Sequence, residues 1–490
     1  MDSPKLKNKL FINNEYIPPK SGHFLTLRNP RDDSILSEQI PIAGKEDVDN
    51  AVVVAQTAFK TTWGRLPGVE RAKVLLKFAD ILEENIPLLA RLEMLAMGQP
   101  IGVAMELAKL GPPVFRYYAG YCDKIYGQML PEDGNGEYSL VQYQPMGVCA
   151  GIAAWNATMI FFAHKVAPAL AAGNTFIFKP SEKSPLASLA LGDLIKSAGF
   201  PPGTINIITG GGETGALLAS HMNIRKISFT GSSAAGRKVQ QAATASNLKS
   251  VTLELGGKSP SIIFDDADME NAVHHSSASF LLNSGQVCVA ASRLLVHRKI
   301  AESFMDQLKA RFEELAGAMG DPESPESYLG PLADRAQTER VLGYFEQARK
   351  DGVRFMTGGC KHERGGNYIQ PTIMVDGSPD SVTWTEEIFG PALSIRIFDT
   401  EDEAIQLAND TSYGLSACVY TSDIARALRV TSLIEAGNIA VNSNYLPGHT
   451  VPFGGWKESG NGSREAGLAG LKSFMETKSV LINMKVGPRL

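Results

Sequence analysis

The feature that most constrains the fold is a regular alternation of short apolar runs and amphipathic segments, which begins at Gly147. Segments with helical spacing, such as 186–198 and 234–245, separate apolar runs of strand length at 148–153, 175–178, 204–208, 226–229 and 252–255. Strands that alternate with helices along a chain form a parallel sheet with helices on both faces. The sequence therefore predicts a doubly wound, Rossmann-like α/β domain in this region.

A second series of the same kind follows, with apolar runs at 261–264, 294–297, 372–375, 392–398 and 439–442. A chain of 490 residues is too long for a single core, so two or three domains are expected. We place the boundary at Gly256-Gly257. The prediction is one α/β domain from residues 1–125 and 145–255, and a second from residues 256–455.

The remaining segments predict a small β element. Residues 9–17 indicate a short hairpin, and residues 126–143 indicate a longer one around Asp133-Gly134-Asn135-Gly136. Residues 473–484 are typical of a terminal strand. We expect 126–144 and 473–490 to form a bridging element, in which the hairpin leaves an open edge and the terminal strand can pair with a neighbouring subunit.

Charge and cysteine content exclude several classes of function. The net charge is −5 and no long run of Lys or Arg occurs, which argues against nucleic-acid binding. The five cysteines form no CxxC pair, so neither a zinc site nor a disulfide framework is expected, and a reducing, cytoplasmic location is favoured. The final tripeptide, Pro488-Arg489-Leu490, resembles a peroxisomal address weakly.

One stretch has the length of a membrane span. Residues 145–163 carry no charge. The stretch is interrupted by Pro145, Gly147, Gly151 and Asn156, and Lys165 follows it closely. We interpret it as a buried strand, a turn and the start of a helix, and we expect no membrane association.

Two residues suggest a nucleophile and its base. Cys288 follows a glycine turn at Gly285, and Glu254 precedes Gly256-Gly257, so both lie on backbone that a small substrate can approach. A single cysteine is more often a small buried residue than a nucleophile, and the pair alone decides nothing.

Two glycine turns are candidates for phosphate binding. Residues 210–215 match the pattern GxGxxG, but no acidic residue follows between Ala216 and Leu253, where the dinucleotide fingerprint requires one. The turn at Gly231-Ser232 runs from an apolar strand into a helix, whose first N–H groups can hold a pyrophosphate. Lys179 and Glu182, after another strand, can bind the ribose hydroxyls of an adenosine.

Two further segments carry polar groups at the ends of apolar runs. Asn156 can donate to a developing oxyanion, although capping the next helix would explain the same residue. Glu387, beside Phe389 and a Gly-Pro turn, can grip a ribose and the ring attached to it, although an exposed charged turn is the simpler interpretation.

The order of the motifs resembles that of the NAD(P)-dependent aldehyde dehydrogenase superfamily over essentially the whole chain, nearest to general-purpose, fungal-type members. The resemblance is carried by Trp155-Asn156, Lys179-Pro180-Ser181-Glu182, Phe229-Thr230-Gly231-Ser232, Glu254-Leu255-Gly256-Gly257-Lys258, Gly285-Gln286-Val287-Cys288, Glu387-Ile388-Phe389-Gly390-Pro391 and Pro452-Phe453-Gly454-Gly455.

The resemblance implies a reaction. Cys288 attacks an aldehyde carbon, Asn156 and the Cys288 backbone N–H hold the oxyanion, hydride leaves to NAD, and Glu254 activates water to hydrolyse the thioester. Because a carboxylate at Glu182 repels a 2′-phosphate, NAD is expected rather than NADP. The implied cofactor-binding residues are Ile152, Trp155, Lys179, Glu182, Gly212, Gly231, Ser232, Glu387 and Phe389. The resemblance further implies a homodimer or homotetramer.

The resemblance also implies a substrate pocket, formed by Ile160, Phe161, His164, Val287, Val289, Tyr445 and Phe453. This mostly apolar set favours a neutral, medium-sized aliphatic or aromatic aldehyde. His164 and Tyr445 either bind a polar group of the substrate or satisfy each other or the backbone.

The sequence departs from the family pattern in two places. The segment Ala154-Trp155-Asn156-Ala157-Thr158 lacks the prolines usual beside Trp-Asn, so a looser loop is expected there. Residues 94–99 replace a more polar stretch. The alternatives left open are an acylating, coenzyme A-dependent dehydrogenase, a cysteine hydrolase and a non-catalytic protein on the same scaffold.

Overall fold

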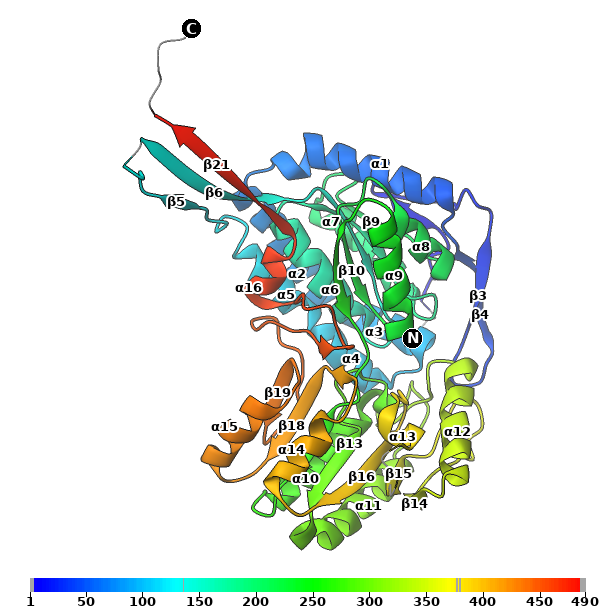
Figure 1. Cartoon of the computed structure of the whole chain (residues 1–490). Helices are drawn as coiled ribbons and strands as arrows, with labels where there is room; N and C mark the ends of the chain where they lie inside the picture. The colour runs from blue at the N-terminus through cyan, green and yellow to red at the C-terminus, as the bar shows by residue number, and fades with distance from the viewer. Residues whose placement is uncertain (1–3, 135, 376–377, 379, 485–490) are drawn as a thin grey trace.

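The computed structural model of the chain describes residues 4–134, 136–375, 378 and 380–484. Asn135 in the predicted hairpin turn and the tripeptide Pro488-Arg489-Leu490 lie outside these residues. Two seven-stranded, largely parallel sheets form the two α/β units, and a small three-stranded sheet extends away from them (Figure 1). The predicted fold class of two doubly wound α/β domains with a bridging β element is confirmed.

The first sheet has the strand order β11-β10-β7-β8-β9-β1-β2. Strands β7 to β11 are parallel to one another, whereas β1 is antiparallel to β9 and forms the predicted antiparallel N-terminal hairpin with β2. Their bounds are β1 Leu10–Ile12, β2 Glu15–Ile17, β7 Val148–Ile152, β8 Thr175–Lys179, β9 Ile205–Ile207, β10 Lys226–Thr230 and β11 Ser250–Glu254.

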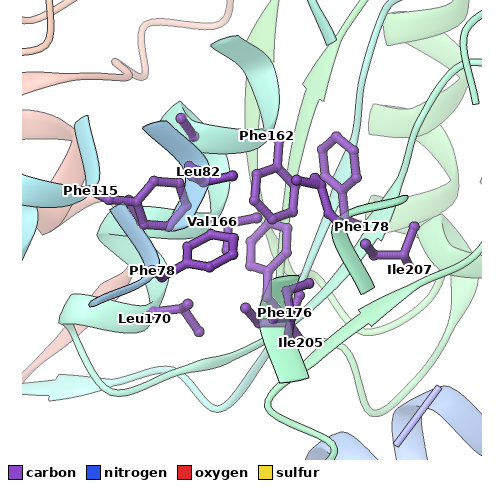
Figure 2. Packing of buried hydrophobic residues seen from close by; sticks show 14 of the residues in the cluster. Phe78, Leu82, Phe115, Phe162, Val166, Leu170, Phe176, Phe178, Ile205 and Ile207 are labelled. Atoms are coloured by element: carbon purple, nitrogen blue, oxygen red, sulfur yellow. The ribbon is translucent and has the colours of Figure 1, made fainter. Parts of the chain in front are cut away.

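Alternate residues of the central strand β8 enter two different cores, because successive side chains of a strand point to opposite faces. Phe176 and Phe178 pack with Phe78, Phe115 and Phe162 in an aromatic core (Figure 2), whereas Ile177 enters the core on the other face. The helices on the aromatic side are α2 Gly68–Glu84, α3 Ile86–Met97, α5 Gly111–Ala119, α6 Thr158–Ala171 and α7 Leu186–Ala198, and those on the other side are α1 Lys45–Thr61, α8 Gly212–Ser220 and α9 Ser233–Ala245.

The second sheet has the order β14-β15-β16-β13-β12-β18-β19, and only the edge strand β14 is antiparallel to its neighbour. The strands are β12 Pro260–Ile263, β13 Arg293–His297, β14 Arg354–Thr357, β15 Thr372–Val375, β16 Ala392–Phe398, β18 Ser416–Tyr420 and β19 Asn438–Val441. The helices around it are α10 Met269–His274, α11 Ala301–Gly317, α12 Arg335–Lys350, α13 Val382–Thr385, α14 Glu401–Asn409 and α15 Ile424–Leu433.

The third sheet has the order β21-β6-β5. Strand β21 (Met475–Asn483) pairs antiparallel with β6 (Glu137–Pro145), in a register from Met475 opposite Pro145 to Asn483 opposite Glu137. Strand β5 (Gln128–Leu130) completes the predicted hairpin with β6. The two segments that we expected to form a bridging element therefore pair within one chain, and β21 forms an open edge of the sheet.

The remaining elements are peripheral. They are the β3–β4 hairpin (Phe24–Arg28 and Ile35–Pro41), the β17–β20 pair (Tyr413–Gly414 and Trp456–Lys457), and helices α4 Ile101–Lys109 and α16 Gly467–Lys472. Residues 145–163 form part of β6, all of β7 and the start of α6, as the interpretation of that stretch requires. In the described part of the chain, no helix has both the length and the apolar character needed to cross a bilayer.

Candidate active site

Cys288 follows a turn in an uncommon conformation. Asn283, Ser284 and Gly285 are consecutive residues with φ of 55°, 54° and 71°, in the left-handed region that most residues avoid. The Ser284 hydroxyl donates to the Gly330 carbonyl at 2.7 Å, and a Cβ atom at Gly285 would lie 2.2 Å from the Gly390 oxygen. The turn is therefore fixed from two sides, and it presents the half-buried Cys288 to a cavity of about 110 Å³.

Glycines bring the distant motifs into contact. A Cβ atom at Gly256 would lie 2.2 Å from Glu387 Oε2, and one at Gly257 would lie 2.6 Å from the Cys288 carbonyl oxygen. The Gly257 N–H also donates to Glu387 Oε1 at 3.1 Å. A Cβ atom at Gly454 would lie 2.9 Å from Glu254 Oε1. These positions therefore require glycine because a functional group of another motif occupies the space of the side chain.

Burial controls the protonation of the Cys288 thiol and of Glu254. Burial, and then the nearby carboxylates of Glu387 and Glu254, raise the pKa of Cys288 to about 12. Burial, and then repulsion by Glu465, raise the pKa of Glu254 well above its ordinary value. In the ligand-free chain the Cys288 thiol is therefore protonated at neutral pH, and the Glu254 carboxylate holds a proton more strongly than an ordinary glutamate does.

A buried ion pair lies behind Glu254. The Lys165 ammonium donates to Glu465 Oε1 at 2.6 Å, to Ser228 Oγ at 2.9 Å and to Thr230 Oγ1 at 2.7 Å, and the Lys165 side chain is completely inaccessible to solvent. Burial acts to raise the pKa of Glu465, but attraction to Lys165 and the hydrogen bonds that Glu465 accepts outweigh it, so this pKa is lowered. Glu465 is thus the charged partner that disfavours the negative form of Glu254.

Replacement of Lys165 by methionine is expected to lower the free energy of unfolding by about 3–5 kcal/mol, because it leaves a buried carboxylate without its cation. Chemical denaturation at pH 7 measures the change. The double replacement Lys165→Met with Glu465→Leu should recover most of the loss, since it removes both charges. A single replacement no worse than that of the exposed Lys309→Met would contradict the expectation.

Asn156 lines the same cavity. It lies in the loop between β7 and α6, it is 4% exposed, and Nδ2 donates to the Gln286 carbonyl at 3.0 Å. A primary amide has two N–H groups, and the second remains available to an oxygen on the substrate side of the cavity. The structure therefore places Cys288, Asn156 and the turn after Glu254 around one cavity, whereas Glu254 itself is buried and is not among the residues that line it.

A larger cavity of about 380 Å³ adjoins the first and shares Ala154, Trp155, Thr230, Gly231 and Ser232 with it. Ser232 caps helix α9 by accepting from the Ala235 N–H at 3.3 Å. The start of α9 borders this cavity, and the start of a helix can attract a phosphate group. Of the predicted cofactor residues, the larger cavity is lined by Ile152, Trp155, Lys179, Glu182, Gly212, Gly231 and Ser232.

Lys179 is buried beside this cavity, and burial lowers the pKa of its ammonium. It donates to the Pro180 carbonyl at 3.1 Å, and Nζ lies 3.9 Å from Glu182 Oε2. The ammonium and the half-exposed carboxylate of Glu182 thus border the cavity side by side.

The other two predicted cofactor residues, Glu387 and Phe389, line the Cys288 cavity. The Phe389 ring packs edge-on against Trp155, with 5.3 Å between ring centroids. Phe389 has a φ of 58°. Gln337 Nε2 donates to the Phe389 carbonyl at 2.9 Å, and Arg340 Nη2 donates to the Glu387 carbonyl at 3.2 Å, so helix α12 holds this segment in place.

The predicted substrate residues fall into four places. Phe161 lines the Cys288 cavity, whereas Ile160 lines a separate small hollow beside Glu93 and Gln99. His164 is buried, and burial lowers its pKa to about 4, so its ring is neutral at physiological pH. The remaining residues form one apolar cluster with Cys288, made of Val287, Val289, Tyr445 and Phe453 together with Leu415 and Ala466.

Sequence reasoning missed Lys165, Glu465, Gln337 and Arg340. For Lys165 a signal was available, because a single charge inside an otherwise apolar helix is costly unless it is paired. Gln337 and Arg340 lie on an ordinary charged helix, and no sequence pattern distinguishes them. In the described residues, no group of three or more His, Cys, Asp or Glu side chains is arranged to hold a metal ion.

The sequence and the structure both match known proteins along their whole length. The sequence is 42% identical to human retinal dehydrogenase 2, over 97% of this chain and 92% of that protein. It is 40% identical to an aldehyde dehydrogenase of Emericella nidulans, over 96% and 94%. The structure matches a point mutant of betaine aldehyde dehydrogenase from Staphylococcus aureus in complex with NAD+, with a TM-score of 0.95, 33% identity and 99% coverage of both chains.

The family-level comparison agrees with these relatives and with the site. The model of the Aldehyde dehydrogenase family matches residues 16–480, which include every motif described above. Fungal and vertebrate relatives match about equally well. The chain belongs to the aldehyde dehydrogenase family.

Proposed function

We propose that this enzyme oxidises an aldehyde to a carboxylic acid, with NAD+ as hydride acceptor, Cys288 as nucleophile and Glu254 as base for water. The observation that carries the proposal is the convergence of Cys288, Asn156 and the turn after Glu254 on one small cavity. That cavity is continuous with a larger one at the start of α9.

The first step forms a bond between the Cys288 sulfur and the aldehyde carbon. The thiol proton leaves to water or a nearby carboxylate, and the carbonyl electron pair moves to oxygen. Asn156 Nδ2 and the Cys288 backbone N–H donate to the resulting oxyanion, and one such donor typically contributes about 3 kcal/mol to the transition state. Bound NAD+ supplies an acceptor for the hydride that leaves the same carbon.

The second step releases the acid. A water molecule loses its proton to Glu254 and attacks the thioester carbon, the carbon–sulfur bond breaks, and the sulfur of Cys288 leaves as thiolate. Because the pKa of Glu254 is raised, this carboxylate can accept a proton near neutral pH more readily than an ordinary glutamate. The same property makes Glu254 a poor base at low pH, where it is already protonated.

The apolar cluster around Cys288 supports a neutral aldehyde of medium size. Val289 and Phe453 are buried there, and the Tyr445 ring stacks on Phe453 with 6.2 Å between centroids. Burial of an aliphatic or aromatic substituent against such side chains is favourable, whereas a substrate charge would be desolvated without a partner. Tyr445 is the polar group of this cluster that can accept or donate a hydrogen bond.

Glu182 supports NAD rather than NADP. Its carboxylate lies next to Lys179 at the larger cavity and would repel a 2′-phosphate. We expect Glu182→Gln to reduce the preference for NAD, measured as the ratio of kcat/KM values, by about tenfold, since each 1.4 kcal/mol corresponds to that factor. Asp193→Asn, on the exposed face of α7, serves as the control. An unchanged ratio in Glu182→Gln would contradict this role.

The test of the proposed function is a spectrophotometric screen of NADH formation with aliphatic, aromatic and hydroxylated aldehydes. Addition of coenzyme A distinguishes the acylating alternative. Product in the form of a free acid supports water as acceptor, and an acyl thioester in its place would refute the role of Glu254. If none of the aldehydes tested leads to reduction of NAD+, a non-catalytic protein on the same scaffold would be favoured.

We also propose a homodimer or homotetramer. The open edge of β21 presents unpaired backbone groups, and Leu481 and Ile482 near its end are exposed at 63% and 38%. Such an edge favours pairing with another chain. Size-exclusion chromatography with light scattering measures the assembly, and a monomer at micromolar concentration would exclude it.

A further inference from the structure

The backbone carbonyl of Asn156 is held by two buried side-chain amides. Gln99 Nε2 donates to it at 3.0 Å, and Asn283 Nδ2 donates to it at 3.1 Å. All three residues are nearly inaccessible, with exposed fractions of 4% for Asn156 and 2% for each of the other two. The two donors come from different parts of the chain, since Gln99 follows helix α3 and Asn283 belongs to the turn before Cys288.

These hydrogen bonds involve both segments in which the sequence departs from the family pattern. The loop after Asn156 has Ala157 and Thr158 where a stiff aromatic-proline pair is usual, and Ala157 has φ −156° and ψ 56°, outside the regular regions. Gln99 ends the second unusual segment, residues 94–99. Gln99, in the second unusual segment, thus anchors the first one, the loop around Asn156, which lacks proline.

Both anchors are themselves fixed. Gly98 caps the end of α3 with a φ of 75°, and a Cβ atom there would lie 2.6 Å from Pro331 Cγ, so the backbone beside Gln99 packs closely against Pro331. Asn283 Nδ2 also lies 3.3 Å from the Gln286 carbonyl, and Gln286 Nε2 donates back to the Asn283 carbonyl at 3.0 Å. The Gln286 carbonyl is the group that accepts from the Asn156 side chain.

We infer that Gln99 and Asn283 are positioning residues that aim the Asn156 amide at the oxyanion. The inference rests on the proposed function, in which Asn156 is the oxyanion donor. Two hydrogen bonds to the carbonyl fix the peptide plane that follows Cα of Asn156, and Nδ2 is fixed by Gln286. Because both the carbonyl and the side chain of Asn156 are held, the second N–H of Nδ2 is held in one direction. Such preorganisation of a donor matters most in the transition state.

The experiment combines Gln99→Met, which keeps the size of the side chain but removes its donor, with Asn156→Ala. In the otherwise unchanged enzyme, Gln99→Met is expected to lower kcat and kcat/KM together by about tenfold, because the lost interaction acts in the transition state. In the Asn156→Ala background it is expected to cost less than about twofold, since no amide remains to be aimed. The KM for NAD+ should be unchanged in every variant.

Asn283→Asp provides a second, independent variant. Aspartate has the size of asparagine and tolerates the left-handed backbone, but it presents an oxygen to the Asn156 carbonyl. The same pattern is expected, with about a tenfold loss that disappears in the Asn156→Ala background. If Gln99→Met does not yield folded protein, this variant carries the comparison.

Thr175→Val is the matched control, because it removes one buried hydrogen bond to a carbonyl, from Thr175 Oγ1 to the Ala55 oxygen at 3.0 Å. Thr175 is the first residue of β8 and lies beside the start of β7, whereas Asn156 follows the end of β7. Thr175→Val should lower stability without the kinetic effect. An equal loss of activity in the presence and absence of the Asn156 amide would overturn the inference, as would unchanged kinetics in both Gln99→Met and Asn283→Asp. Full activity in Asn156→Ala alone would instead refute the proposed role of Asn156, and the inference with it.

Discussion

Cys288→Ala is expected to abolish aldehyde-dependent NADH formation, with a loss of kcat of at least about 10⁴-fold, as is usual when a covalent nucleophile is removed. The remaining chain keeps its cavity at the start of α9, so NAD+ should bind with unchanged affinity. Thiol reactivity offers a second measurement, because the pKa of Cys288 in the ligand-free chain is raised to about 12. Alkylation should therefore be slow at neutral pH and accelerate as pH rises.

Cys360→Ala is the matched control, since Cys360 is exposed and lies outside both cavities. It should leave kcat unchanged. NADH formation by Cys288→Ala at a rate comparable with that of the unsubstituted enzyme would refute the covalent mechanism as a whole.

Glu254→Gln has the second largest expected effect, and it should separate the two halves of the reaction. Steady-state turnover should fall by about 10²–10⁴-fold, the usual contribution of a general base. The first turnover should survive, because attack by Cys288 and hydride transfer precede the hydrolysis that needs this base. Rapid mixing with aldehyde and NAD+ should therefore give a burst of about one NADH per active site, followed by very slow turnover.

The pH dependence follows from the direction of the pKa shift. Burial and Glu465 raise the pKa of Glu254, so the ionised form that accepts the proton of water increases with pH over a range above that of an ordinary glutamate. Turnover limited by hydrolysis should increase with pH in the same range, and Glu254→Gln should remove that dependence. Glu458→Gln, an exposed carboxylate paired with Arg237, should retain it. Loss of the burst in Glu254→Gln would show that Glu254 acts before hydride transfer.

The strands were predictable where burial in the folded protein leaves a continuous apolar run in the sequence. Strands β15 and β16 have the bounds that the sequence predicts, because both are buried on two faces and therefore read as continuous apolar runs. Strand β18 was missed. Its residues Ser416–Tyr420 include serine, alanine and cysteine, whose small side chains suit a buried central strand but give a weak apolar signal. The antiparallel edge strand β14 was missed as well, since it is short and only partly buried.

The candidate site was predictable only in its motifs. Cys288, Glu254 and Asn156 occur in segments whose glycines and order are distinctive. Gln99 and Asn283 were not predicted, because their role depends on a single carbonyl oxygen that lies 57 and 127 residues away along the chain. A glutamine after a helix has many ordinary uses, and the sequence does not tell which backbone group it meets.

The glycine contacts have a consequence for protein engineering. Gly256 makes room for Glu387, Gly257 for the Cys288 backbone, and Gly454 for Glu254. Each glycine thus leaves a space that a residue of another motif fills. In two of the three cases, the glycine and that residue are more than a hundred residues apart in the sequence. Grafting only the cysteine and the glutamate onto another α/β scaffold would therefore transfer the reactive groups without the glycine-containing loops that make room for them. The smallest unit that can be transplanted is the whole set of interlocking loops.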